Sequence, residues 1–89
     1  MPKPDFWFVY VLKCANGAFY TGITKDVPAR LKAHNNGTGA SYTRSFGPVK
    51  LVWTERRASK SLALKREARI KSWSSQAKAA FVRKKALAR

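Results

Sequence analysis

The feature that most constrains the fold is a continuous apolar run, Phe6 to Leu12, followed shortly by the pair Asn16-Gly17. Aromatic and β-branched side chains fill most of this run, which predicts a β-strand covered on both faces. Asn-Gly is a strong signal for a hairpin turn, so we expect the return strand over residues 18–23. A chain with such a hairpin near its start must build a sheet and cover it.

Helix signals follow the hairpin directly. Asp26 is a suitable N-cap and Pro28 suits the first helical turn, so we expect a helix from there to about Asn36. Residues 37–47 are polar and contain several glycines, which predicts a loop. A third strand is expected after this loop, over residues 49–55.

Serines mark the starts of two further helices. Ser59 predicts the N-cap of a helix that runs to about Trp73. Ser74 or Ser75 caps a last helix, which we expect to end near Lys85.

The expected elements give the order β-β-α-β-α-α. They predict an α+β fold in which a small three-stranded antiparallel sheet is flanked by helices. We expect residues 1–5 to form a loose leader, residues 6–85 a single domain and residues 86–89 a basic tail.

The charge of the chain indicates a polyanionic partner. Nineteen Lys and Arg side chains face four Asp and Glu side chains, for a net charge of +15. Thirteen of the nineteen lie in residues 46–89. Nucleic acid is the expected partner, because neutralised phosphates release counterions. A basic surface that serves solubility or association with ribosomes is the alternative.

Several classes of protein are excluded or disfavoured. Cys14 is the only cysteine, so no intramolecular disulfide can form, and no Cys/His cluster has zinc-ligand spacing. No apolar run is long enough to span a membrane, and residues 1–5 lack the core of a signal peptide. The cytoplasm is therefore the expected location.

Few residues are available for chemistry, and Glu67 is the least ordinary of the acids. It borders the apolar residues Ala63 and Ile70 on its helix, where a carboxylate needs a partner. A single carboxylate suits Mg²⁺, which keeps several water ligands. A solvated Glu67 that bridges Lys71 or Lys60 is the alternative.

Arg30 and His34 are four residues apart and so share one side of a helix. Arg30 suits a phosphate and His34 suits proton transfer near neutral pH. Tyr10 and Tyr20 lie on the predicted hairpin, and a tyrosine is a poor base unless a cation lowers its pKa. A bound metal ion, Arg30 or His34 is expected to supply that effect.

These residues resemble the GIY-YIG nuclease superfamily over nearly the whole chain. The first motif stands here as Val9-Tyr10-Val11 and the second as Tyr20-Thr21-Gly22, with the two tyrosines ten residues apart. Arg30 lies ten residues further on, followed by His34, and Glu67 matches the metal-ligand Glu of the family. The chain is similar to small stand-alone bacterial members and to the nuclease domain of Slx-type structure-specific endonucleases.

The resemblance implies an endonuclease-type hydrolase that cleaves phosphodiester bonds in nucleic acid. The expected substrate is DNA rather than RNA, and the resemblance suggests a role in DNA repair. Tyr10 would be the general base, although some members use the second tyrosine, and Tyr20 would order the water or a phosphate oxygen. Arg30 would neutralise the phosphate and His34 would tune a tyrosine or shuttle a proton. Glu67 would hold one Mg²⁺ or Mn²⁺ ion.

The chain also departs from the family pattern. The Gly and Ile of the first motif are replaced, and Ile23 stands where some relatives carry a Lys. Further substrate contacts are expected from four residues: Asn36, Thr43, Arg44 and Lys71.

Two alternatives stay open. One is a nucleic-acid-binding module that is inactive alone or needs a protein partner or a homo-oligomer, with Phe81 and Val82 of the last helix as a docking surface. The other is a structural or ribosome-associated protein.

Overall fold

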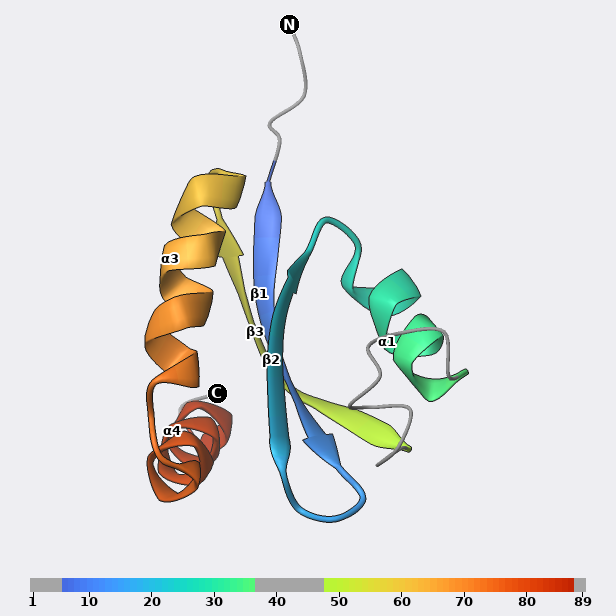
Figure 1. The fold of residues 1–89 in the computed structure, drawn as a ribbon, viewed down its shortest axis with the longest axis vertical. Helices are drawn as coiled ribbons and strands as arrows, with labels where there is room; N and C mark the ends of the chain where they lie inside the picture. The colour runs from blue at the N-terminus through green and yellow to red at the C-terminus, as the bar shows by residue number, and fades with distance from the viewer. Residues whose placement is uncertain (1–5, 37–47, 88–89) are drawn as a thin grey trace, which may run out of the picture.

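The computed structural model describes residues 6–36 and 48–87, and these form a three-stranded antiparallel sheet with helices on both faces (Figure 1). The strand order is β2-β1-β3, so the first strand is central, as its apolar run predicts. The α+β fold and the element order β-β-α-β-α-α are both confirmed. The elements are β1 Trp7–Cys14, β2 Phe19–Thr24, α1 Val27–Asn35, β3 Val49–Arg57, α3 Lys60–Lys71 and α4 Ser75–Leu87.

The predicted caps start the helices. The side chain of Asp26 accepts from the backbone N–H of Ala29 at 3.1 Å, and Ser59 accepts from that of Leu62 at 3.2 Å. At the last helix the cap is Ser74, whose hydroxyl accepts from the N–H of Ala77 at 3.1 Å. Each cap satisfies a backbone donor that the first helical turn cannot pair internally.

The strands run further than their apolar patterns predict. β1 continues to Cys14 and β3 to Arg57, because the ladder pairs Cys14 with Val49 and Trp7 with Arg57. The last helix likewise continues to Leu87, two residues past its expected end. Pairing between strands extends the sheet beyond the residues whose side chains are apolar.

The alternation along β1 divides the interior into two layers. Val9 and Val11 point to one face, where α3 and α4 pack. Tyr10 and Leu12 point to the other face, which α1 covers (Figure 1). Alternate side chains of β1 therefore pack in the larger apolar core on one face of the sheet and against α1 on the other.

A β-bulge lets β3 serve both layers as well. Leu51 pairs with Leu12 and Trp53 pairs with Val11, which leaves Val52 as the extra residue. Leu51 therefore packs in the α1 layer, whereas Trp53 packs in the layer under α3 and α4. Without the extra residue these two side chains, two positions apart, would share one face.

The last helix is held by an aromatic cluster around Arg66. Phe81 packs edge-on against Trp53 and Trp73, with ring centroids 5.1 and 5.0 Å apart. The Arg66 guanidinium lies 5.7 Å from the Phe81 centroid and 5.8 Å from each of the two indoles. Phe81 and Val82 are partly buried and pack against the protein's own core, and the docking role of this helix stays a prediction.

No helix in the described residues is both long enough and apolar enough to cross a membrane.

Candidate active site

Four of the predicted site residues meet on the face of the sheet that α1 covers. Tyr10 lies on β1, Tyr20 on β2, and Arg30 and His34 on α1. The ring of His34 lies 5.9 Å from that of Tyr10 and 5.1 Å from that of Tyr20, measured between centroids. We call these four residues the tyrosine cluster.

Hydrogen bonds link three members of the cluster in a chain. The Arg30 Nε–H donates to the Tyr10 hydroxyl at 3.4 Å. The Tyr10 hydroxyl oxygen lies 3.0 Å from His34 Nε2. The tautomer of His34 decides whether the Tyr10 hydroxyl donates to Nε2 or accepts from it.

Burial determines the protonation states of Tyr10 and His34. Tyr10 and His34 are only 2% and 1% exposed. Burial, and then the charge of Arg30, lowers the pKa of His34 from its ordinary value of 6.5. His34 is therefore neutral at neutral pH and able to accept a proton.

The expectation that cations lower the pKa of Tyr10 is only partly right. Burial raises this pKa above its ordinary value of 10.0, and the hydrogen bond from Arg30 opposes that effect without overcoming it. The charges of Tyr20 and Glu67 raise it further. Desolvation of the phenolate outweighs one guanidinium here, so Tyr10 is a protonated phenol in this structure.

Arg30 contacts both tyrosines. Its pKa is raised first by the hydrogen bond to Tyr10, and Tyr20 contributes through its charge and a hydrogen bond of its own. A single guanidinium thus lies beside two hydroxyls, where it would stabilise a phenolate on either one.

Gly22 makes room for Tyr10, and the hairpin places these two residues opposite each other in the ladder. A Cβ on Gly22 would lie 2.6 Å from the Tyr10 hydroxyl oxygen and 2.7 Å from Cζ. The glycine of the second motif is therefore required by a close approach, which its position opposite Tyr10 in a predicted hairpin could have indicated.

Glu67 acts on the cluster from α3. Its carboxylate is 17% exposed and forms an ion pair with Lys71 at 3.4 Å, one of the two bridges considered as alternatives. Its charge raises the pKa of Tyr10, which relates it electrostatically to the cluster.

The other predicted contacts are dispersed. Asn36 is exposed and caps the C-terminus of α1. Lys71 forms an ion pair with Glu67. Thr43 and Arg44 lie outside the described residues.

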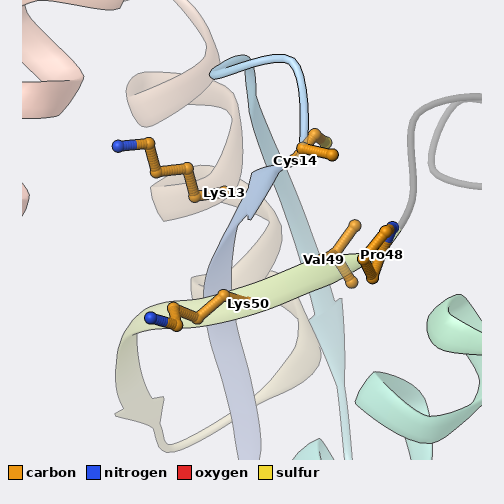
Figure 2. Close-up of a pocket in the computed structure, with 6 residues that line it drawn as sticks. Lys13, Cys14, Pro48, Val49 and Lys50 are labelled. Carbon is orange, nitrogen blue, oxygen red and sulfur yellow. The ribbon is translucent and has the colours of Figure 1, made fainter.

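Cys14 has no features of a nucleophile. It is 3% exposed, and burial raises the pKa of its thiol, which keeps it protonated. An open hollow of about 360 Å³ is lined by Cys14, Val49 and Pro48, at the hairpin end of the sheet. Figure 2 shows that Lys13 and Lys50 extend their amines away from these three residues.

The tyrosine cluster thus brings two tyrosines, one guanidinium and a neutral imidazole together on one face of the sheet, and these are residue types that hydrolytic sites use. Comparison with known proteins agrees, since residues 6–80 match the family model described as the GIY-YIG catalytic domain. The chain belongs to the GIY-YIG family, a family of nucleases that act on nucleic acid.

Small proteins of similar length are its relatives. UPF0213 proteins from Staphylococcus aureus strains Mu50 and N315 are 47% identical over 81 residues, which cover 91% of this chain and 99% of each relative. The solution NMR structure of UPF0213 protein BH0048 from Bacillus halodurans is similar, with 43% identity, a TM-score of 0.56, and coverage of 86% of this chain and 82% of that one. That of protein EF2693 from E. faecalis has 37% identity and a TM-score of 0.62, with 98% and 93% covered.

Proposed function

We propose that this protein is a divalent-metal-dependent nuclease that hydrolyses phosphodiester bonds in nucleic acid, at a site formed by the tyrosine cluster and Glu67. The observation that carries the proposal is the placement of Arg30 beside both tyrosines, with neutral His34 hydrogen-bonded to Tyr10. A hydrolytic site needs a proton acceptor and a fixed positive charge in one place, and this cluster supplies both.

The burial of Tyr10 supports Tyr20 as the hydroxyl that faces the attacking water. The Tyr10 hydroxyl is occupied on both sides, by Arg30 and by His34, and burial disfavours its phenolate. Tyr20 is only half-buried, and Arg30 lies beside it. In this scheme the Tyr20 phenol first loses its proton to solvent, and the phenolate beside Arg30 then accepts the proton of the attacking water.

Tyr10 and His34 then have a supporting role. The hydrogen bond between Tyr10 and His34 holds the imidazole edge against the Tyr20 ring. Tyr10 also fixes the Arg30 side chain by accepting from its Nε–H, so that the remaining guanidinium donors point to the phosphate. Arg30 keeps its charge throughout and stabilises the charge that develops on the phosphate.

The donor set suits a metal ion that is mostly coordinated by water. The described residues contain no group of three or more His, Cys, Asp or Glu side chains, which disfavours a zinc site. Glu67 alone fits Mg²⁺ or Mn²⁺, which keep several waters and use one or two carboxylates with substrate phosphate. Such an ion would polarise the phosphate.

The substrate is proposed to be DNA rather than RNA, in a repair context and in the cytoplasm, by analogy with the family. Asn36 is proposed as a substrate contact because it lies exposed at the end of the helix that carries Arg30 and His34.

The experiment is cleavage of labelled single-stranded, duplex, flap and four-way-branched DNA, and of RNA, with Mg²⁺, Mn²⁺ or EDTA. Glu67→Gln should abolish metal-dependent cleavage and retain binding. Asp26→Asn is the matched control, since it removes the same charge and Asn is also a good N-cap. Full cleavage by Glu67→Gln would refute the proposal.

The same assay tests the proton acceptor. Tyr20→Phe should reduce cleavage by a factor of about 100 or more, which is the usual contribution of a general base. Tyr10→Phe keeps the ring over Gly22 and should reduce cleavage less. The opposite ranking would assign the base to Tyr10.

A binding module without activity of its own is the second candidate. The ion pair between Lys71 and Glu67 favours it, because the lysine competes with a metal ion for the carboxylate. Salt-dependent binding with no product in any metal would support this candidate.

A further inference from the structure

Asn35, the last residue of α1, joins this helix to the sheet through a hydrogen bond that the cleavage scheme does not use. Its side-chain Oδ1 accepts from the backbone N–H of Val49 at 2.8 Å. Val49 is the first residue of β3 and lies 14 positions further along the chain. Asn35 therefore ties the end of the helix that carries Arg30 and His34 to the start of β3 (Figure 1).

We propose that Asn35 is a positioning residue for cleavage: its bond to Val49 fixes the last turn of α1, and thereby the place of the His34 imidazole in the tyrosine cluster. The inference rests on the proposed function for the reaction that the residue serves. Asn35 has no contact with substrate in this scheme and acts through His34.

Two hydrogen bonds to two different strands determine how the end of α1 lies on the sheet. His34 is bonded to Tyr10 on β1, and Asn35, the next residue, is bonded to Val49 on β3. Consecutive side chains of a helix point about 100° apart, so the two bonds run in different directions. One bond alone would let the last turn rotate about it, whereas the two together fix both its rotation and its height above the sheet.

Few apolar contacts could replace this anchor. Among the described apolar residues of the layer beside the tyrosines, Leu31 alone comes from α1. The backbone of α1 packs mainly against β3, whereas the two tyrosines lie on β1 and β2. Arg30 and His34 therefore reach across the sheet from a helix that is held at β3. A small rotation of α1 there displaces the ends of both side chains more than it displaces the helix backbone.

The strand needs this bond more than the asparagine does. Val49 is 7% exposed, and a buried backbone N–H that loses its partner is costly. Asn35 is an exposed residue, whose amide water could satisfy equally well. The bond is therefore maintained by the start of β3, which makes the strand a fixed point for the end of the helix.

The first test follows His34 directly. It is the only histidine of the chain, so NMR titration of ¹⁵N-labelled protein measures the pKa of one imidazole. Burial lowers this pKa in wild type, and Asn35→Ala should raise it toward 6.5 because the imidazole is no longer held in place. The matched control is Asn16→Ala, since Asn16 Oδ1 also accepts from a backbone N–H, that of Ala18 at 3.0 Å in the hairpin turn. This control should leave the titration unchanged.

The second test separates positioning from stability by kinetics, with the labelled substrate that wild type cleaves fastest and at a temperature where every variant is folded. In Asn35→Ala, kcat should fall by roughly 10- to 100-fold, the effect of misplacing a group by about 1 Å. KM should stay within about twofold of wild type, because no substrate contact is lost.

Two further variants test the bond itself. Asn35→Asp keeps an acceptor for the Val49 N–H and should restore most of kcat, with Asn16→Asp as the control for the added charge. Asn35→Gln keeps the amide but extends it by one methylene, so the bond can form only if the end of α1 shifts, and kcat should stay low. A residue with a merely structural role would change stability without this ranking.

Equal His34 titrations in Asn35→Ala and Asn16→Ala would overturn the inference. A wild-type kcat in Asn35→Ala would overturn it as well, because the place of the imidazole would then not depend on the bond or not affect the reaction. If Asn35→Ala fails to fold by circular dichroism, Asn35→Gln takes its place in both tests, with the same expected changes.

The two proposals fail separately. Absence of cleavage by wild type in every metal would remove the nuclease proposal, and the His34 titration would still decide whether Asn35 positions the imidazole. Cleavage lost in Glu67→Gln, together with a wild-type kcat in Asn35→Ala, would keep the nuclease and remove the positioning role.

Discussion

The closest packing in the site is that of Tyr10 against Gly22. Tyr10 cannot move aside easily, because its hydroxyl is bonded to both His34 and Arg30 and its ring is buried. Any side chain at residue 22 must therefore displace the whole chain of hydrogen bonds. The glycine is a requirement of the site rather than of the strand.

We expect Gly22→Ala to destabilise the protein by about 1–3 kcal/mol, the usual cost of an overpacked interior. Cleavage should fall far more than this loss of stability explains, because Tyr10 and Arg30 lose their positions. Urea unfolding and cleavage by the folded variant measure the two effects. Unchanged activity in Gly22→Ala would contradict the proposed role of the hydrogen-bond chain.

Gly17→Ala is the matched control. Gly17 has a φ of 87°, which an alanine adopts only with strain, but no atom lies within 4 Å of an added Cβ. This variant should lose roughly 1 kcal/mol through the turn, with normal activity in the folded protein.

At the scale of the elements, Arg66 joins α3 to both β3 and α4. Its Nε–H donates to a Glu55 carboxylate oxygen at 3.2 Å, and its guanidinium lies against three aromatic rings. The aliphatic part of the side chain is buried with these rings, so both its charge and its packing contribute.

Arg66→Ala should therefore lower stability by about 2 kcal/mol, which combines a charged hydrogen bond with partly buried cation–π contacts. For a domain of this size the melting temperature should fall by about 10 °C. Arg69→Ala, an exposed residue of the same helix, should change stability by less than about 0.5 kcal/mol. Equal melting temperatures for the two variants would refute the role of Arg66.

The elements themselves could be predicted from sequence because local signals mark them. The apolar run of Phe6–Leu12 correctly indicates the central strand, and Asp26 and Ser59 correctly mark helix starts. The bulge at Val52 leaves no local signal, since it depends on pairing with β1.

The site was less predictable than the fold. Spacing identified Tyr10, Tyr20, Arg30 and His34, and the structure brings these four together. The direction of the Tyr10 pKa could not be predicted, because it depends on how completely the sheet and α1 exclude water.

At the scale of the whole molecule, the buried pair Tyr10 and His34 limits the range of pH in which the fold is stable. Because the pKa of His34 is lowered, the folded protein binds fewer protons than the unfolded chain below about pH 6.5. Stability should therefore decrease as the pH falls through the range from 6.5 to the lower pKa of folded His34. Because the pKa of Tyr10 is raised, stability should also decrease as the pH rises above about 10.

Urea unfolding across the pH range, on wild type, His34→Gln and Tyr10→Phe, tests both limits. In His34→Gln, the free energy of unfolding should no longer show the decrease at acid pH that His34 causes. In Tyr10→Phe, it should no longer show the decrease at alkaline pH that Tyr10 causes. Comparison with wild type removes the contributions of groups that all three proteins share. Identical profiles for the three proteins would contradict the assignment.

The bulge at Val52 limits which deletions the gene for this protein can tolerate during evolution. Loss of one codon from a surface loop is usually harmless, and loss of one codon from a strand end is often tolerated. Loss of codon 52 would instead make the β3 ladder regular, and the residues on one side of the gap would exchange their faces. Either Trp53 would leave the core under α3 and α4, or Leu51 would leave the layer behind the tyrosines. Lineages of this protein should therefore vary hardly at all in the length of β3, and residue 52 should stay apolar because Val52 also packs against the core under α3 and α4.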